Sequence, residues 1–172
     1  ELVAAAAAVA SLPPAPPAEP LAFADFGCSE GANAVAQMGA AVSSARAALD
    51  AKAAGAAPPR PITVTHVDLT DNPWGTVFKC VAAAPGYADP PRSFVYAQGS
   101  PSGFYSQAFP SGSLALAHGA ATFHWGSSAP PSLPDQCLFP WLASDPAVRA
   151  ACAAQAAADW AAILRHRAAE LR

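Results

Sequence analysis

The feature that most constrains this chain is a regular alternation between short apolar runs and longer stretches with helical patterns. The runs contain β-branched and aromatic residues and are bounded by turn-forming residues, so they are predicted to be strands. They cover residues 21–24, 62–67, 93–97 and 113–117, the last being the weakest. Strands that alternate with helices form right-handed β-α-β units. The sequence therefore predicts an α/β fold, with a parallel sheet flanked by helices.

The helical stretches differ in how clearly their ends are marked. The last one is the clearest, because Asp145 is placed to cap it and Pro146 suits its first turn. The other helices are expected at residues 2–10, 32–54 and 78–84. We interpret the first of these as an Ala-rich helix rather than a secretion signal, because no basic leader precedes it. Since the chain opens with Glu rather than Met, we expect its true N-terminus to be missing.

Charge and cysteine content exclude several classes of function. The formal net charge is −3 and the pI is about 5.7, so the chain lacks the basic face of a nucleic-acid-binding protein. No apolar run is long enough to span a bilayer, so we expect no membrane partner. The four cysteines lie far apart and form neither a Cys-x-x-Cys pair nor a zinc-spaced cluster. We therefore expect no metal site, and free thiols in the reducing cytoplasm.

A general rule for open parallel sheets places the ligand beyond the carboxyl ends of the strands. It selects three loops as one site, at residues 25–31, 68–69 and 99–105. The first loop does not follow the Gly-x-Gly-x-x-Gly pattern, and Glu30 would repel a pyrophosphate, which disfavours a nicotinamide oxidoreductase. Its glycines would let the backbone approach the amino and carboxylate groups of an amino-acid moiety.

The other two loops offer contacts for a nucleoside. Asp68 could accept hydrogen bonds from both ribose hydroxyls, and Phe104 or Tyr105 could stack on a purine. Taken singly, a helix cap or a solvated loop acid would be the better explanation of Asp68, and core packing the better explanation of either aromatic residue. Together the loops match S-adenosylmethionine, which favours a methyltransferase. Separately, His124 and Trp125 could hold an acceptor by hydrogen bonding and stacking, or Trp125 could simply cover an edge of the core.

Several motifs resemble one known family in the family's own order. Three segments resemble the signatures of SABATH carboxyl methyltransferases: residues 24–33 (ADFGCSEGAN), 102–114 (SGFYSQAFPSGSL) and 118–130. The third segment contains the His-Trp pair. Residues at intervals between 155 and 171 also resemble the helix that comes next in the family. The resemblance implies a class I S-adenosyl-L-methionine-dependent methyltransferase fold with a Rossmann-like parallel sheet. It also implies methyl transfer to a small-molecule carboxylate, which gives a methyl ester.

The resemblance implies specific roles for residues of this chain. Asp25, Cys28 and Asn33 would line the methionine end of the cofactor, Asp68 and Leu69 its ribose and adenine edge, and Phe104 the adenine face. The implied cofactor-binding residues are Asp25, Gly27, Cys28, Asn33, Asp68, Leu69, Gly103 and Phe104. The implied acceptor site holds Ala121, His124 and Trp125. No catalytic side chain is expected, because a carboxylate is already ionised and the site acts by positioning and desolvation.

The chain also departs from the family. Gly103 stands where the family has Ser, and Ala121 stands where it has an aromatic wall. We expect residues 1–20 to form an Ala/Pro-rich helix and linker, and residues 21–172 a partial cofactor-binding domain that lacks later strands and the helical cap. N-methylation of a purine-like acceptor, and a non-catalytic nucleotide-binding α/β module, remain alternatives. A homodimer is left open.

Overall fold

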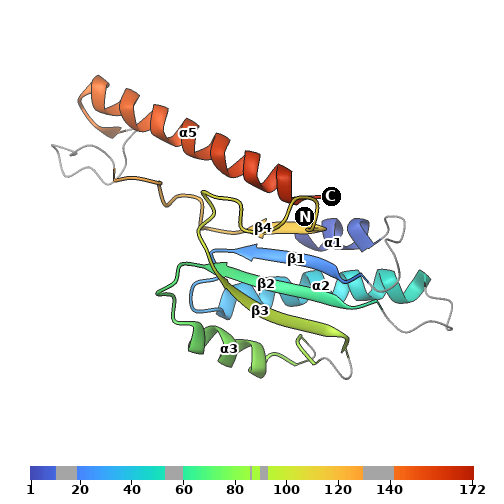
Figure 1. Ribbon diagram of the computed structural model, residues 1–172. Helices are drawn as coiled ribbons and strands as arrows, with labels where there is room; N and C mark the ends of the chain where they lie inside the picture. Colours follow the sequence, from blue (N-terminus) through green and yellow to red (C-terminus); the bar gives the residue numbers. More distant parts are fainter. Residues whose placement is uncertain (11–18, 53–59, 86, 90–92, 130–141) are drawn as a thin grey trace.

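The computed structural model describes residues 1–10, 19–52, 60–85, 87–89, 93–129 and 142–172 (Figure 1). Its helices are α1 (Leu2–Ala10), α2 (Ala32–Lys52), α3 (Trp74–Ala83) and α5 (Pro146–Glu170). Its strands are β1 (Leu21–Phe26), β2 (Ile62–Asp68), β3 (Val95–Pro101) and β4 (Leu116–Gly119). Most of the predicted proline-rich linker, and Cys137, lie outside the described residues.

The strands form one parallel sheet in the order β3-β2-β1-β4. Asp25 of β1 pairs with His66 of β2, which in turn pairs with Gly99 of β3. The helix α2 connects β1 to β2, and α3 connects β2 to β3, as β-α-β units require. The predicted α/β class with a parallel sheet is therefore confirmed, and all four strands end at the same edge (Figure 1).

Alternation along each strand gives the sheet two different apolar faces. Phe23 of β1 and Val64 of β2 pack with Met38 of α2 in one core cluster, to which α1 and α3 also contribute. Phe26 and Val67, one pleat away, face the opposite side, where they pack with residues of the segment between β3 and β4. Helices thus cover one face, and an irregular segment supported by α5 covers part of the other.

The strand boundaries differ from those predicted, for a shared reason. β1 runs through Asp25 to Phe26 instead of stopping at Ala24, because Asp25 has strand partners on both sides. β3 covers Val95–Pro101 rather than residues 93–97, because it pairs with the whole of β2. Pairing with a neighbouring strand therefore overrides local turn signals.

The remaining elements agree with prediction in kind but shift in position. The strand predicted at residues 113–117 is β4, three residues later, and the helix predicted at 78–84 begins already at Trp74. The cap of α5 is confirmed, since the Asp145 carboxylate accepts a hydrogen bond from the Ala147 N–H at 2.8 Å. Among the described residues, we find no helix that combines the length and apolar character needed to cross a bilayer.

Candidate functional site

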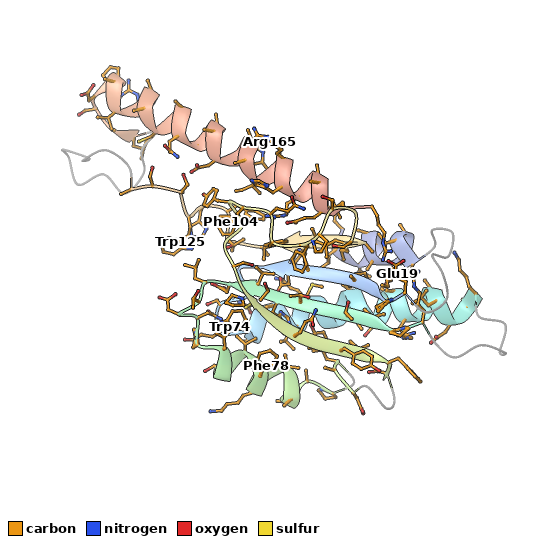
Figure 2. All side chains as sticks on the ribbon, in the orientation of Figure 1. Glu19, Trp74, Phe78, Phe104, Trp125 and Arg165 are labelled. Atoms are coloured by element: carbon orange, nitrogen blue, oxygen red, sulfur yellow. The ribbon has the colours of Figure 1, made fainter. Side chains whose placement is uncertain are left out.

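A cavity of about 630 Å³ lies at the carboxyl ends of β1 and β2. All three loops selected from the sequence contribute to it, together with the segment from residue 121 to 127. The predicted site residues that line it are Gly27, Asp68, Leu69, Gly103, Phe104, Ala121, His124 and Trp125. Figure 2 shows Phe104 and Trp125 at this end of the sheet, below α5. The fold thus brings together side chains that span a hundred residues of sequence.

Three predicted residues are not among those that line the cavity. Asp25 lies one pleat behind it, on the helix-covered face, where its carboxylate faces His66. The Cys28 side chain is buried against Ala34 and Val77. Asn33 is exposed in the first turn of α2. The contacts of these three residues with the methionine end of a cofactor therefore stay predictions.

The turn after β1 requires its glycines. Gly27 has φ +78°, and a Cβ built there would lie 2.0 Å from Thr122 Oγ1, so only glycine admits this close approach. Thr122 belongs to the segment that carries His124 and Trp125. The turn at the end of β1 and the segment that carries His124 and Trp125 are therefore in direct contact.

Asp68 ties this turn to the end of β2. Its Oδ2 accepts from the Ser29 N–H at 2.7 Å and its Oδ1 from the Leu69 N–H at 2.8 Å. The Asn72 amide adds a hydrogen bond to the Ser29 carbonyl at 2.9 Å. Each carboxylate oxygen of Asp68 keeps a further lone pair, so a diol in the cavity would find two acceptors.

An aromatic series supports the Phe104 side of the cavity. The Phe104 ring meets Phe123 edge to face, with centroids 5.3 Å apart, and Phe123 meets Trp160 of α5 in the same manner at 5.8 Å. Such arrangements are the preferred geometry of aromatic pairs. Phe104 is thereby held between the sheet and α5, with its neighbour Tyr105 at 4.8 Å.

The end of α5 holds the backbone of the same loop. Arg167 donates to the Phe104 carbonyl at 2.9 Å and the Ser106 carbonyl at 3.0 Å. It also pairs with Glu170, at 2.6 Å from Nε to Oε2. Glu170 Oε1 in turn accepts from the Ala108 N–H at 2.6 Å. This buried ion pair therefore sets the course of the segment that presents Phe104.

Asp159 anchors the segment that carries Trp125. Its carboxylate accepts from the Ser127 N–H at 3.0 Å and the Ser127 hydroxyl at 2.6 Å, and Gln155 donates to it at 2.8 Å. The Ser127 hydrogen bonds lower the pKa of Asp159 below its usual range. The Tyr105 hydroxyl donates to the Trp125 carbonyl and lies 3.4 Å from Asp159 Oδ2. Burial, and then the Asp159 charge, raise the pKa of Tyr105, so it remains a donor.

Four residues that support the site were not predicted from the sequence: Thr122, Ser29, Asp159 and Glu170. One signal was available for the last two, since they are the acidic residues of an otherwise Ala-rich 25-residue helix. Asp159 has no basic residue three or four positions away, which indicates a partner elsewhere in the fold, whereas Glu170 has Arg167 three positions before it. Nothing local marked Thr122 or Ser29, whose importance comes from what they touch.

The chemistry of the cavity fits a nucleoside without phosphates. Neither Lys nor Arg is among its described lining residues, so a pyrophosphate would find no cation there. Asp68 supplies acceptors for hydroxyls, and Leu69 and Phe104 supply apolar and aromatic surface. Within the described ranges, no group of His, Cys, Asp and Glu is arranged to hold a metal ion. The lining residues therefore suit S-adenosyl-L-methionine better than a dinucleotide.

Comparisons with known proteins agree with this geometry. A family model described as SAM dependent carboxyl methyltransferase matches residues 3–172. The chain is 33% identical to indole-3-acetate O-methyltransferase 1 of Arabidopsis thaliana, over 68% of this chain and 31% of that protein. It is 29% identical to loganic acid O-methyltransferase of Catharanthus roseus, over 69% of this chain and 29% of that protein.

A solved structure gives the same result for the fold. Loganic acid methyltransferase with SAH matches 99% of this chain with a TM-score of 0.75 and 26% sequence identity. The match covers 48% of that chain. The present chain thus spans about half of the solved structure and less than a third of each curated relative.

Proposed function

Because this chain belongs to the SAM-dependent carboxyl methyltransferase family, we propose that the whole protein transfers a methyl group to the carboxylate of a small molecule. The product would be a methyl ester. The observation that carries the proposal is the single cavity that Asp68, Phe104, His124 and Trp125 line together. A cofactor side and an acceptor side share one space there, as a direct transfer requires.

The residues of the cavity divide into two groups in this proposal. Asp68 and Leu69 hold the ribose and adenine edge, and Phe104 with Gly103 forms the adenine face. Gly27 lets the chain approach the cofactor closely. The methionine end is assigned to Asp25, Cys28 and Asn33. The first three assignments are supported by the position of these residues in the cavity at the carboxyl ends of the strands. The assignment of the methionine end rests on the family resemblance alone.

The acceptor is assigned to Ala121, His124 and Trp125. S-adenosyl-L-methionine, when bound, supplies an electrophilic methyl on sulfur. A carboxylate acceptor is ionised at neutral pH, so no side chain needs to remove a proton. The work of the protein is then to align the acceptor and exclude water. Trp125 is 68% exposed, so an acceptor would bury apolar surface by packing on its ring.

Calorimetry with S-adenosylhomocysteine, followed by a panel of carboxylic acids, tests the proposal. We expect the chain to bind the product cofactor, and the whole protein to form a methyl ester that mass spectrometry identifies. Trp125→Ala should raise the acceptor KM and leave the cofactor affinity near normal. Equal loss of both would assign Trp125 a structural role, and absence of cofactor binding would overturn the proposal.

A non-catalytic nucleotide-binding module is the second candidate, and one observation favours it. Ala121 is exposed and too small to wall the acceptor side. Cofactor binding without turnover on any acid would support this candidate. An N-methylated product would instead indicate a purine-like acceptor.

The cellular location and the partners of the protein are part of the same proposal. We place it in the cytoplasm, supported by the free thiols of the described cysteines Cys28, Cys80 and Cys152. A small carboxylic acid is its proposed partner. A homodimer remains a prediction, which sedimentation of the whole protein would test.

A further inference from the structure

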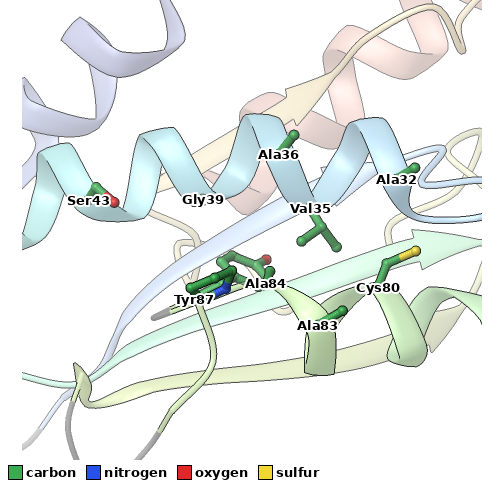
Figure 3. Close-up of a pocket in the computed structure, with 10 residues that line it drawn as sticks. Ala32, Val35, Ala36, Gly39, Ser43, Cys80, Ala83, Ala84 and Tyr87 are labelled. Atoms are coloured by element: carbon green, nitrogen blue, oxygen red, sulfur yellow. The ribbon is translucent and has the colours of Figure 1, made fainter.

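A chain of three hydrogen-bonded side chains runs behind the wall of the cavity. Asp25 Oδ2 lies 3.0 Å from His66 Nδ1, and His66 Nε2 lies 2.9 Å from the Tyr87 hydroxyl. Asp25 and Tyr87 are each 3% exposed, and His66 is fully buried. Tyr87 also lines a separate hollow of about 440 Å³ between α2 and α3 (Figure 3). The three residues come from β1, β2 and the segment after α3.

When the ring of His66 is neutral, its partners select one tautomer. An ionised Asp25 can only accept, so Nδ1 must carry the proton that it donates. In the neutral ring Nε2 is then an acceptor, which needs a donor opposite, and the Tyr87 hydroxyl supplies it. Burial raises the pKa of Tyr87, so the phenol keeps its proton. Tyr87 therefore holds His66 in the tautomer that donates to Asp25.

Packing alone does not explain this arrangement. His66 occupies the helix-covered face of β2, on which Ile62 and Val64 contribute to the apolar core. An aliphatic side chain would fill such a position without a partner, whereas a buried imidazole requires both of its nitrogens to be satisfied. Retaining three polar groups here costs desolvation free energy. This free-energy cost is explained if the Asp25 carboxylate must keep one orientation.

Asp25 has acceptor capacity left over. Within the described part of the chain, its carboxylate accepts one side-chain hydrogen bond, that from His66. A buried carboxylate has about four lone-pair sites, so a cation or donor can still be accommodated. Asp25 precedes Gly27 by two residues, and Gly27 lines the cavity. Asp25 is 3% exposed and is not among the lining residues, so an ammonium group would have to reach past Gly27 to the end of β1 to meet the carboxylate, which His66 has already turned.

We propose that His66, held in one tautomer by Tyr87, is a positioning residue that orients the Asp25 carboxylate toward the amino group of the bound cofactor. The inference rests on the proposed function and deepens it. It predicts a loss confined to ligands that carry the amino-acid end. Ligands with the same nucleoside but no ammonium group would not depend on His66.

The test compares two ligands on the 172-residue chain. S-adenosylhomocysteine carries the amino-acid end, and 5′-methylthioadenosine has the same nucleoside without it. We expect His66→Leu and Tyr87→Phe to weaken S-adenosylhomocysteine binding by about tenfold, the loss that follows when a hydrogen bond to a charged group is removed. Binding of 5′-methylthioadenosine should stay within about twofold, which is the scatter expected from changes outside the contact.

A matched control and a second readout keep the test decisive. Tyr96→Phe makes the same chemical change at an exposed tyrosine of β3 and should alter neither affinity. Nitrogen NMR of labelled histidine should show the Nδ1-protonated ring of His66 in the unaltered chain, and a change of tautomer in Tyr87→Phe. Tyr87→Phe removes one oxygen and keeps the ring, so it remains informative if His66→Leu does not fold.

The outcomes separate this proposal from the one on which it rests. Equal losses for both ligands, or an unchanged affinity for S-adenosylhomocysteine in Tyr87→Phe, would overturn the role of His66 and leave the cofactor assignment intact. Failure of the unaltered chain to bind either ligand would overturn the proposed function, and this inference with it. A loss for S-adenosylhomocysteine alone supports both.

Discussion

The backbone N–H of Ser29 donates to the Asp68 carboxylate at 2.7 Å, although 39 residues separate them in sequence. This hydrogen bond joins the turn after β1 to the end of β2. Asp68 therefore has two tasks in the proposed site, since it orders the turn and offers its remaining lone pairs to a ligand. Cofactor affinity and the geometry of the turn are expected to depend on the same side chain.

Asp68→Ala should weaken S-adenosylhomocysteine binding by roughly 1–3 kcal/mol, the usual loss when hydrogen bonds to a charged group are removed. Titration calorimetry measures the effect. Asp71→Ala is the control, because Asp71 is an exposed acid of the same loop and does not line the cavity. An unchanged affinity in Asp68→Ala would remove Asp68 from the site.

Gly27→Ala should lower the free energy of unfolding by about 3 kcal/mol or more, because it combines a strained φ with overlap against Thr122. Gly112→Ala separates the two causes, since Gly112 has φ +64° but open space around its Cβ position. That control should cost about 1 kcal/mol. Urea unfolding of both variants gives the comparison, and equal losses would show that the contact with Thr122 is unimportant.

Glu170→Gln should destabilise the fold by about 3–5 kcal/mol, because it leaves Arg167 buried without its countercharge. The same change at Glu19, whose ion pair with Arg172 is exposed, should cost less than about 1 kcal/mol. Denaturant unfolding measures both. If Glu170→Gln is as stable as Glu19→Gln, the ion pair does not support the Phe104 loop.

Asp159→Asn should increase hydrogen exchange at residues 125–127, because the amide replaces one of the two oxygens that accept from Ser127 with an NH2 donor. The folded-state pKa of Asp159 is lowered. Its stabilising contact is therefore present above the unfolded pKa and is lost as the pH falls through the lower folded value. Exchange rates corrected for intrinsic pH dependence should show this loss in the unaltered chain and not in Asp159→Asn. Asp145→Asn, which keeps a capping side chain, is the control.

Cys28 should resist alkylation in the folded chain at pH 8. Burial, followed by the charges of Asp68 and Asp25, raises the pKa of its thiol from 9.0 to about 12. The reactive thiolate is therefore scarce at pH 8, and the folded state loses stability as the pH rises from about 9 toward 12. Mass spectrometry after iodoacetamide treatment, with and without denaturant, measures the difference. Rapid modification of the folded chain would contradict the buried position of Cys28.

Sequence patterns were sufficient where the determining interactions are local or periodic. The cap formed by Asp145 follows from neighbouring residues, and the parallel direction of the strands follows from the alternation of elements. Because parallel strands end at one edge, the meeting of Asp68 and Phe104 in one cavity was also predictable. These predictions needed no knowledge of which distant side chains touch.

Local patterns failed where a distant partner changed the outcome. An acid at the end of an apolar run was interpreted as the end of a strand, yet Asp25 continues β1 because His66 lies opposite, 41 residues later. In the same way, β3 continues through Gly99 because β2 pairs with it. The residues next to Asp25 do not reveal that His66 is its partner, and those next to Gly99 do not reveal that β2 pairs with it.

The sequence alone determined the class of fold, the edge of the sheet that carries the cavity, and the resemblance to carboxyl methyltransferases. Only the tertiary structure decided that Asp25 turns inward to His66, and that α5 holds both walls through Asp159 and Glu170. The physical reason is the range of the interactions. Propensity and periodicity act between near neighbours, whereas a hydrogen bond across the core depends on how whole elements pack.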